Sequence, residues 1–413
     1  MKKQKVFQST RMKLSVAGIL FLGTVLLFTN GVVAGEKPDI IRVSAIADLT
    51  GPYAAGMGGL APGFEDAWKY INTELGGVRG VKVELVIRDM AGKMPLALTM
   101  YNELINMNPK PLFVLLGNSA FGAAVRERLK EDDIIGYVAP ATDCVYPVGN
   151  SYAIHPFYPD MMAANVKYIK DNWKQQRNPK MGIIVWDTAY GRGILTDEFF
   201  AYLKSIGVDI VGTETFGVRE LDVKSQLLRL RAKDPDYLII HTAVGGTIAI
   251  KKSCKEIGWE IKTINSIGTE WATVRAVPQL FDGDICQFNV KSFDEVDDPS
   301  IKTIMKHFNK NGRTINEVAL YYLMAWVGAS IQHAAMVNVV DKYGWGGFNT
   351  RNCLEAVLNL RNFMPLGGLS NVNYSEKRPT EAKSRIYNVK NGKILPLTAD
   401  FVELPDLRPA KYK

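Results

Sequence analysis

The chain has 413 residues, 47% hydrophobic and 22% charged, a balance typical of a globular protein with a sizeable core. Five of its 50 Lys and Arg residues, and none of its 42 Asp and Glu residues, lie in residues 1–34, so the rest of the chain has a net charge of only +3. The remaining basic residues are scattered singly rather than clustered in a stripe with aromatic residues, which argues against nucleic-acid binding.

The first 34 residues have the pattern of an export signal. A basic segment precedes an apolar core over residues 14–28, and small residues follow at 32–34. The alternative is an uncleaved membrane anchor, but this apolar core is short for a spanning helix, which needs about 20 residues. No Cys stands at the expected cleavage point, Gly35, so a lipoprotein signal is not supported. We therefore predict a cleaved signal peptide over residues 1–34 and a periplasmic location.

The length that remains, residues 35–413, is more than one hydrophobic core usually holds and indicates two domains. It contains Cys144, Cys254, Cys286 and Cys353, with no C-x-x-C spacing among them. Export permits disulfides, but four cysteines do not fix a pairing. We expect small buried thiols with at most one bridge.

From Ile40 onward, short β-branched runs alternate with segments of helical period. This alternation is typical of βαβ units, and the apolar character of the runs is that of parallel strands covered on both faces. No repeat and no low-complexity linker is present, so two domains require the chain to cross back and forth. The strand-like runs cover residues 40–49, 81–89, 111–117, 134–140, 181–187, 208–216, 236–243, 262–268, 284–290 and 384–394. The clearest helical segments between them cover residues 63–75, 193–207, 223–234 and 247–259.

One later segment, residues 318–340, is apolar enough to raise the question of a membrane span. It contains Ser330, Gln332, His333 and Asn338, and polar groups are costly in a bilayer core. We predict a helix buried inside a large domain.

Ligands bind open α/β sheets at the carboxyl ends of the strands, so the turns after the strand-like runs are candidate sites. The turn GNSAFG, residues 117–122, has the glycine spacing of a P-loop, but Ala123 and Ala124 stand where Lys and Ser or Thr are required. The turn after the first run, GPYAAGMGG, lacks the G-x-G-x-x-G order. Free backbone N–H groups and the Ser119 hydroxyl suit a single carboxylate better than a nucleotide.

Two further turns supply the rest of a site for a free amino acid. Thr142 adds a hydroxyl beside the backbone amides of Ala141 and Thr142, and Glu270 follows a later strand, where it would hold an ammonium group. Simpler interpretations remain open for each residue. Ser119 and Thr142 could be helix N-caps, Glu270 a solvated loop charge, and Tyr190 a packed aromatic with its hydroxyl at the surface.

The sequence has no pattern typical of an enzyme or a metal site. G-x-S-x-G and H-E-x-x-H are absent, and no Cys is paired with a His by its context. Asp48, Asp187 and Glu270 would form a carboxylate pair only if the fold brought them together. We therefore expect no catalysis and no cofactor. We also expect no metal, since the spacing typical of metal ligands is missing among His155, His241, His307 and His333.

Several segments resemble the periplasmic branched-chain amino acid binding proteins of ABC transporters. The most specific are IRVSAIADLTGPYAAGMGGLAPGFEDAWKYIN and AYGRG, supported by GVRGVKVELVIRD, by GNS with VAPATD, and by DPDYLIIHTAV, over about residues 40–393. The resemblance implies an α/β fold of two doubly wound lobes, the type I periplasmic-binding architecture, joined by three crossover strands with a ligand closed between them. We expect an N-terminal lobe of residues 35–156 and 290–370, and a C-terminal lobe of residues 157–289 and 371–413.

The resemblance also implies roles for particular residues. The family's carboxylate site falls on Ser119, Ala141 and Thr142, its second-lobe aromatic on Tyr190, and its ammonium-binding acid on Glu270. We therefore expect the ligand to be bound by Ser119, Ala120, Ala141, Thr142, Tyr190, Ala243, Glu270 and Trp271.

The side-chain pocket departs from the family pattern. Aromatic residues of the family align with Gly56 and Ala243, while Trp271 is a gain, so the pocket is expected to differ in shape. The family's disulfide near the second strand has no counterpart, since Met90 and Asn118 lie near its positions. Leucine, isoleucine or valine is thus in doubt as the ligand.

These observations predict that the protein captures a small carboxylate-bearing ligand and delivers it to an inner-membrane ABC permease. The leading candidate for this ligand is an amino acid of the branched-chain type. The chain is expected to act as a monomer and to perform no chemistry. Alternatives are an aromatic or other organic acid as ligand, a ligand-sensing role for a membrane receptor, and, less favoured, a secreted hydrolase.

Overall fold

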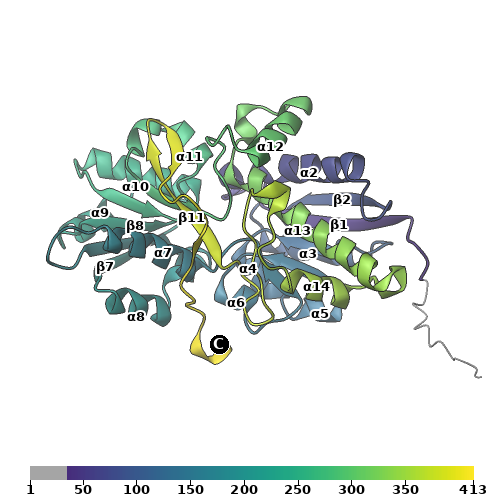
Figure 1. Ribbon diagram of the computed structural model, residues 1–413. Helices are drawn as coiled ribbons and strands as arrows, with labels where there is room; N and C mark the ends of the chain where they lie inside the picture. The colour runs from purple at the N-terminus through teal and green to yellow at the C-terminus, as the bar shows by residue number, and fades with distance from the viewer. Residues whose placement is uncertain (1–34) are drawn as a thin grey trace, which may run out of the picture.

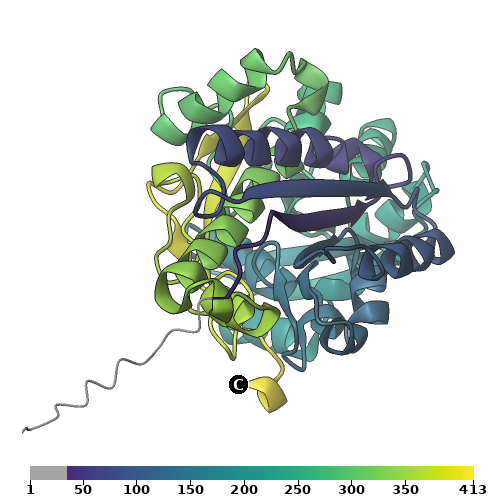
Figure 2. The same cartoon turned by 90° about the vertical axis from the view of Figure 1, so that its right-hand side faces the viewer.

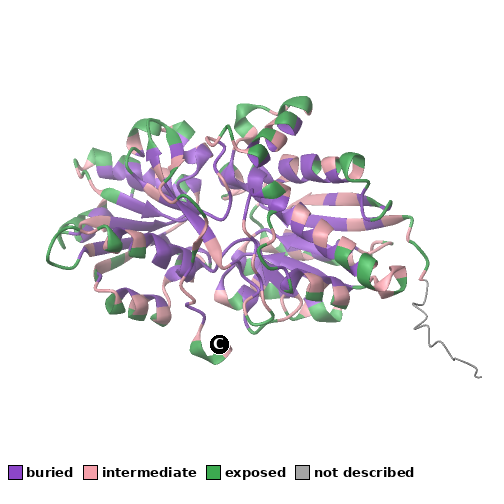
Figure 3. Ribbon diagram, in the orientation of Figure 1, coloured by how far each residue is buried: buried purple, intermediate pink, exposed green. Residues whose placement is uncertain are grey.

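The computed structural model describes residues 35–413, and the predicted signal peptide over residues 1–34 lies outside them. Two α/β lobes lie side by side, each built on its own β-sheet (Figure 1). Buried residues fill the strands of both sheets and the zone where the lobes meet, while exposed residues gather on the outer helices (Figure 3). The predicted fold class, two doubly wound lobes with crossover connections, is confirmed.

The first lobe holds a five-stranded, entirely parallel sheet in the order β2-β1-β3-β4-β5. Figure 2 looks at this lobe end-on, with the long helix α2 lying along strands β2 and β1. The strands are β1 Ile40–Ala47, β2 Lys82–Asp89, β3 Phe113–Leu116, β4 Ile135–Val138 and β5 Ser151–Ala153. The helices are α1 Ala54–Met57, α2 Leu60–Glu74, α3 Met94–Ile105, α4 Ser119–Val125, α5 Arg128–Glu131, α6 Thr142–Val145, α12 Pro299–Lys310, α13 Leu320–Tyr343 and α14 Thr350–Leu358.

The second lobe holds a mixed sheet in the order β12-β11-β10-β9-β8-β6-β7, with β13 paired to β11. Strands β6 to β10 are parallel, and β11 returns antiparallel to β10. The strands are β6 Lys180–Trp186, β7 Asp209–Phe216, β8 Tyr237–His241, β9 Lys262–Asn265, β10 Ile285–Phe288, β11 Lys383–Lys390, β12 Lys393–Pro396 and β13 Val402–Glu403. The helices are α7 Tyr158–Asp171, α8 Asp197–Ser205, α9 Lys224–Arg231, α10 Val244–Glu256 and α11 Trp271–Ala276. Short 3-10 turns are η1 Gly191–Ile194, η2 Pro278–Leu280, η3 Ile315–Glu317, η4 Trp345–Gly347, η5 Pro365–Gly367 and η6 Ala410–Tyr412.

Two details of the strand prediction were wrong. The last predicted run, residues 384–394, is a hairpin of β11 and β12, because Asn391 and Gly392 adopt positive φ angles of 52° and 72° and reverse the chain. Strands β5 and β13 were missed, since three and two residues are too few to show a pattern. The exact lobe boundaries stay a prediction, although the elements divide between the two sheets in the expected order.

The apolar segment predicted as a buried helix is α13. It is long and apolar enough to cross a membrane by composition, but 67% of its most apolar window is buried within the protein. Helices α2 and α14 pack on it, which accounts for its apolar composition without a bilayer.

All four cysteines are free and buried, in keeping with the expectation of small buried thiols with at most one bridge. Met90 and Asn118, which lie near the positions expected for the family's disulfide, are in contact. Asn118 donates from Nδ2 to the Met90 sulfur at 3.6 Å, a weak polar contact.

The three passages between the lobes are hydrogen-bonded to one another at the hinge. The Tyr374 hydroxyl donates to the carbonyl of Ala153 at 2.8 Å, and Asn289 Nδ2 donates to Glu381 Oε2 at 2.7 Å. Glu381 is fully buried and its side-chain partners, Asn289 and Tyr374, are neutral. Burial therefore raises the pKa of Glu381 to about 8.

Within the first lobe, the buried carboxylate of Asp66 joins α2 to the chain around α13. Arg313 donates to it from Nε at 3.0 Å and Nη2 at 2.8 Å, Asn311 Nδ2 donates at 2.9 Å, and the Tyr322 hydroxyl donates at 2.6 Å. Because these donors come from sequence positions far from Asp66, the cluster fixes how α2 and α13 pack.

We predict that Asp66→Ala lowers the free energy of unfolding by about 3 kcal/mol, because it leaves a partly buried cation and two further donors without their buried acceptor. Denaturant unfolding monitored by tryptophan fluorescence measures this change. Glu65→Ala is the matched control, since Glu65 contacts the same Arg313 at 2.8 Å with 54% of its side chain exposed. Exposed pairs contribute roughly 0–1 kcal/mol, so equal losses in the two variants would contradict the role given to Asp66.

The pKa of Glu381 predicts a pH dependence of stability. Because that pKa is higher in the folded than in the unfolded chain, the folded state binds more protons between about pH 4.5 and 8, and stability falls as pH rises through this window. Glu381→Gln should flatten this slope, which reaches at most about 1.4 kcal/mol per pH unit for one group. Urea unfolding at a series of pH values measures it. Glu376→Gln, an exposed neighbour in the same connection, should follow the wild type.

Candidate functional site

A cavity lies between the lobes, at the carboxyl ends of strands from both sheets. It offers about 40 Å³ to the centres of water-sized molecules, and one water needs about 10–15 Å³. A ligand of more than a few non-hydrogen atoms therefore requires the lobes or their side chains to move apart. The cavity is lined by Tyr53, Gly56, Met57, Gly117, Asn118, Ser119, Ala139, Ile154, Tyr158, Tyr190, Ala243, Val244, Ile267, Glu270, Leu320 and Tyr321.

The turn after β3 reaches the cavity because it starts with a glycine. A Cβ on Gly117 would lie 2.6 Å from the Cα of Ala47, so a larger residue would push β3 away from the end of β1. The close approach of these two strands brings the turns that follow them to the same wall of the cavity.

Within this turn, Asn118 rather than Ser119 caps helix α4. The Asn118 side chain accepts the N–H of Phe121 at 2.8 Å. Ser119 is thus relieved of capping, and its hydroxyl, in a residue only 2% exposed, lies 3.4 Å from the Tyr158 hydroxyl. The interpretation of Ser119 as an N-cap is wrong, and its hydroxyl is available at the cavity wall.

Four tyrosines surround the cavity: Tyr53, Tyr158, Tyr190 and Tyr321. The Tyr190 ring lies 5.2 Å from that of Tyr158 and 6.2 Å from that of Tyr53, both edge to face. Burial raises the pKa of all four hydroxyls, which therefore keep their protons and can donate to an anion. Tyr190 already donates to the carbonyl of Thr242 at 3.3 Å.

Glu270 joins the two lobes at the edge of the cavity. One carboxylate oxygen accepts the N–H of Ala272 at 3.1 Å in its own helix α11, and the other accepts the N–H of Leu320 at 2.9 Å, at the start of α13 in the other lobe. Glu270 is 1% exposed, so the interpretation as a solvated loop charge is wrong. Burial raises its pKa to about 7, against the opposing effect of the two amides.

A family model described as periplasmic binding protein matches residues 40–393. The chain belongs to this family. The resemblance noted in the sequence is thereby confirmed. Among curated proteins, no significant match to the sequence is found.

Solved structures of periplasmic binding proteins share the fold at low sequence identity. A branched-chain amino acid ABC transporter protein from Thermus thermophilus with bound valine is 18% identical, with a TM-score of 0.78 over 91% of this chain and 98% of that one. A fatty acid ABC transporter substrate-binding protein from Thermomonospora curvata is 18% identical, with a TM-score of 0.77 over 91% and 95%. The branched-chain amino acid binding protein LivJ from Streptococcus pneumoniae with isoleucine is 16% identical, with a TM-score of 0.72 over 89% and 100%.

Half of the predicted ligand residues of this periplasmic binding protein line the cavity, namely Ser119, Tyr190, Ala243 and Glu270. Ala120, Ala141 and Thr142 lie in the expected turns but are not part of the lining; Ala120 is exposed, and Ala141 rather than Thr142 occupies the N-cap position of α6. The interpretation of Thr142 as an N-cap is therefore wrong. Ligand contact by all of these residues stays a prediction.

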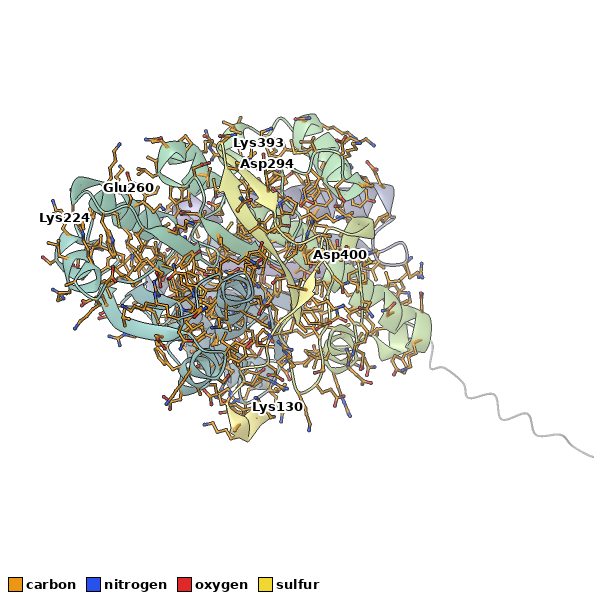
Figure 4. The ribbon with its side chains drawn as sticks, turned by 60° about the vertical axis from the view of Figure 1, so that its left-hand side comes forward. Lys130, Lys224, Glu260, Asp294, Lys393 and Asp400 are labelled. Atoms are coloured by element: carbon orange, nitrogen blue, oxygen red, sulfur yellow. The ribbon has the colours of Figure 1, made fainter. Side chains whose placement is uncertain are left out.

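Trp271 lies away from the cavity, under the β11–β12 hairpin. Its indole N–H donates to Asp294 at 3.1 Å, and its ring packs against Phe288 and Phe293 at 5.2 and 5.1 Å. Figure 4 shows Asp294 beside Lys393 on this hairpin. In this arrangement Trp271 fills the core of the second lobe rather than enlarging the pocket.

Three of the cavity tyrosines were not singled out from the sequence. Tyr53 belongs to the glycine-rich turn after the first strand, Tyr158 opens helix α7, and Tyr321 opens α13. The signal that could have found them is a tyrosine at the start of a helix that follows a loop.

Gly56, which aligns with an aromatic residue in the family pattern, lies close to Val244 of the other lobe. A Cβ added at Gly56 would stand 3.5 Å from Val244 Cγ2.

We predict that Tyr321→Phe weakens binding of a carboxylate ligand by about tenfold or more, because it removes a hydroxyl that can donate to a charged group. Isothermal titration calorimetry with a ligand found by screening measures this change. Tyr343→Phe, the same substitution at the far end of α13 and outside the cavity lining, should leave the affinity unchanged. A wild-type affinity in Tyr321→Phe would remove this residue from the binding site.

Proposed function

We propose that this protein is the substrate-binding component of an ABC transporter and that it captures a small carboxylate-bearing ligand with an apolar body between its lobes. It acts in the periplasm and delivers the ligand to an inner-membrane permease. The observation that carries the proposal is that a single cavity receives polar groups from both lobes: Ser119 and Tyr321 from the first, Tyr190 and Glu270 from the second.

A ligand held in this way favours the closed arrangement of the lobes. Contacts to both walls exist only when the lobes are together, so the ligand binds the closed state more tightly than the open one and shifts the population towards it. The hinge residues Ala153, Asn289 and Glu381 lie at the passages about which such a movement would turn.

The chemistry of the lining supports a carboxylate with an apolar body. Hydroxyl donors lie beside apolar side chains, including those of Met57, Ile154 and Val244. The structural relatives are described with valine, with isoleucine, or as a fatty acid transporter protein, and these compounds share a carboxylate on an apolar chain. Both a branched-chain amino acid and an organic acid fall within this class.

The same lining gives no support to a hydrolase. Among residues 35–413, Glu270 is the only acidic side chain on the cavity. Asp48 accepts backbone N–H groups from its own turn, at 2.7 Å from Gly51 N, and Asp187 pairs with Arg192 at the surface at 2.6 Å. A general acid–base pair would need a second carboxylate within reach of the ligand.

A thermal-shift screen of amino acids and of branched, straight-chain and aromatic monocarboxylates tests the proposal. Ligand binding adds about 2.7 kcal/mol to the stability at a concentration of 100 times Kd, so a true ligand should raise the melting temperature by several degrees. Sugars and amines of similar size serve as controls. If no carboxylate shifts the melt of the folded protein, the proposed function is wrong.

A further inference from the structure

We propose that the ligand of this protein carries a carboxylate but no ammonium group, and that Glu270 acts as a latch between the lobes instead of binding an amine. The inference rests on the proposed function and narrows its substrate class to organic acids. It departs from the role that the family pattern gives to the acid at this position.

The hydrogen bonds of Glu270 are the first argument. The N–H of Ala272 and the N–H of Leu320 both lie in the first turn of a helix, where backbone donors have no partner within the helix. Glu270 satisfies one donor in each lobe, with one oxygen for each. The protein's own backbone thus supplies a hydrogen-bond partner for each carboxylate oxygen, so an acid at this position does not require an amine in the ligand.

A second contact joins the same two elements. Arg275, one turn after Glu270 on α11, donates from Nη1 to the carbonyl of Val318 at 3.0 Å, just before α13. Glu270 and Arg275 together hold the start of α13 to α11 across the lobes. The pair acts on lobe closure whatever the chemistry of the ligand.

The second argument is the balance of donors and acceptors on the cavity. An ammonium group needs up to three acceptors, whereas the other polar side chains of the described lining are hydroxyls and the amide of Asn118. The hydroxyls of Ser119, Tyr158 and Tyr321 can donate to an anion as well as accept, but they are neutral and cannot balance the charge of an ammonium group. Glu270, the one carboxylate of the described lining, already accepts two backbone N–H groups, and this set of groups favours an anion without an attached cation.

The two ligand classes differ in the sign of their pH dependence. Burial raises the pKa of Glu270 to about 7, so a second carboxylate bound nearby favours its protonated form, and acid binding should strengthen as pH falls from 8 to 6. An ammonium group needs the ionised form, so amino acid binding should strengthen as pH rises.

The other titratable groups around Glu270 do not change charge in this range. Burial raises the pKa of the thiol of Cys286, and the pKa values of the four cavity tyrosines are raised as well. Burial lowers the pKa of His241 behind Tyr190 to about 3, which keeps the ring neutral. Arg275 is the basic neighbour of Glu270 on α11.

The experiment compares acids with their 2-amino counterparts by calorimetry at pH 6 and pH 8. The probes are 4-methylpentanoate against leucine, 3-methylbutanoate against valine, and 3-phenylpropanoate against phenylalanine. We expect at least one acid to bind tenfold or more tightly than its amino acid, and to gain up to about tenfold in affinity per pH unit on acidification. Tighter amino acid binding that strengthens with pH would overturn the inference and leave the proposed function intact. Binding of no carboxylate at all would overturn both.

Variants of Glu270 separate a latch from an amine-binding residue. At pH 6, where Glu270 near a bound carboxylate is protonated and its charge does not discriminate between the two ligand classes, Glu270→Ala should weaken binding of acid and amino acid alike, on the order of tenfold, and leave the ratio of their affinities unchanged. A selective loss of the amino acid would show that Glu270 holds its ammonium group and would overturn the inference. Glu270→Gln keeps the size of the side chain and gives the same ratio test if the Ala variant does not fold; it should also abolish the pH dependence. Glu260→Gln, at an exposed position of the second lobe (Figure 4), is the matched control and should behave as the wild type.

Discussion

The arrangement of the cavity depends on one carboxylate that accepts backbone N–H groups from both lobes. Glu270 holds the first turns of α11 and α13 together, and α13 carries Tyr321 into the cavity. Because helix-start amides have no partner within their own helix, this single side chain removes two unsatisfied donors from a buried region. The relative position of the lobes is therefore set by local helix capping as well as by the three passages at the hinge.

Much of the fold could be predicted from the sequence, because parallel strands that are buried on both faces are continuous apolar runs. The runs at residues 40–49 and 181–187, for example, correspond to β1 and β6, and the turn at Gly117 lies where a strand meets a helix, as predicted. The hairpin was missed although its turn carries the signal, since Asn391-Gly392 is the dipeptide typical of a two-residue hairpin. Strand β5 could not be predicted, because three residues are too few to show a pattern.

The candidate site was less predictable than the fold. The turns that approach the cavity were identified, since strand ends share one edge of a parallel sheet. The role of each residue within a turn was not predicted. Whether Asn118 or Ser119 caps α4 depends on backbone angles, which a sequence does not contain. Trp271 was expected at the pocket for its size, but Phe288, Phe293 and Asp294, brought together only by tertiary packing, draw its ring into the core.

The antiparallel strand β11 has a consequence for how the molecule assembles. It pairs with β10 after an excursion of the chain through α12, α13 and α14 of the other lobe, so neither lobe is a continuous stretch of sequence. Until the last passage of the chain arrives, the edge of β10 is an unpaired row of backbone groups, the kind of edge that invites pairing with another chain. Completion of the second lobe thus depends on residues synthesised after the helices of the first lobe, and the native two-lobed form becomes accessible only once β11 has paired with β10.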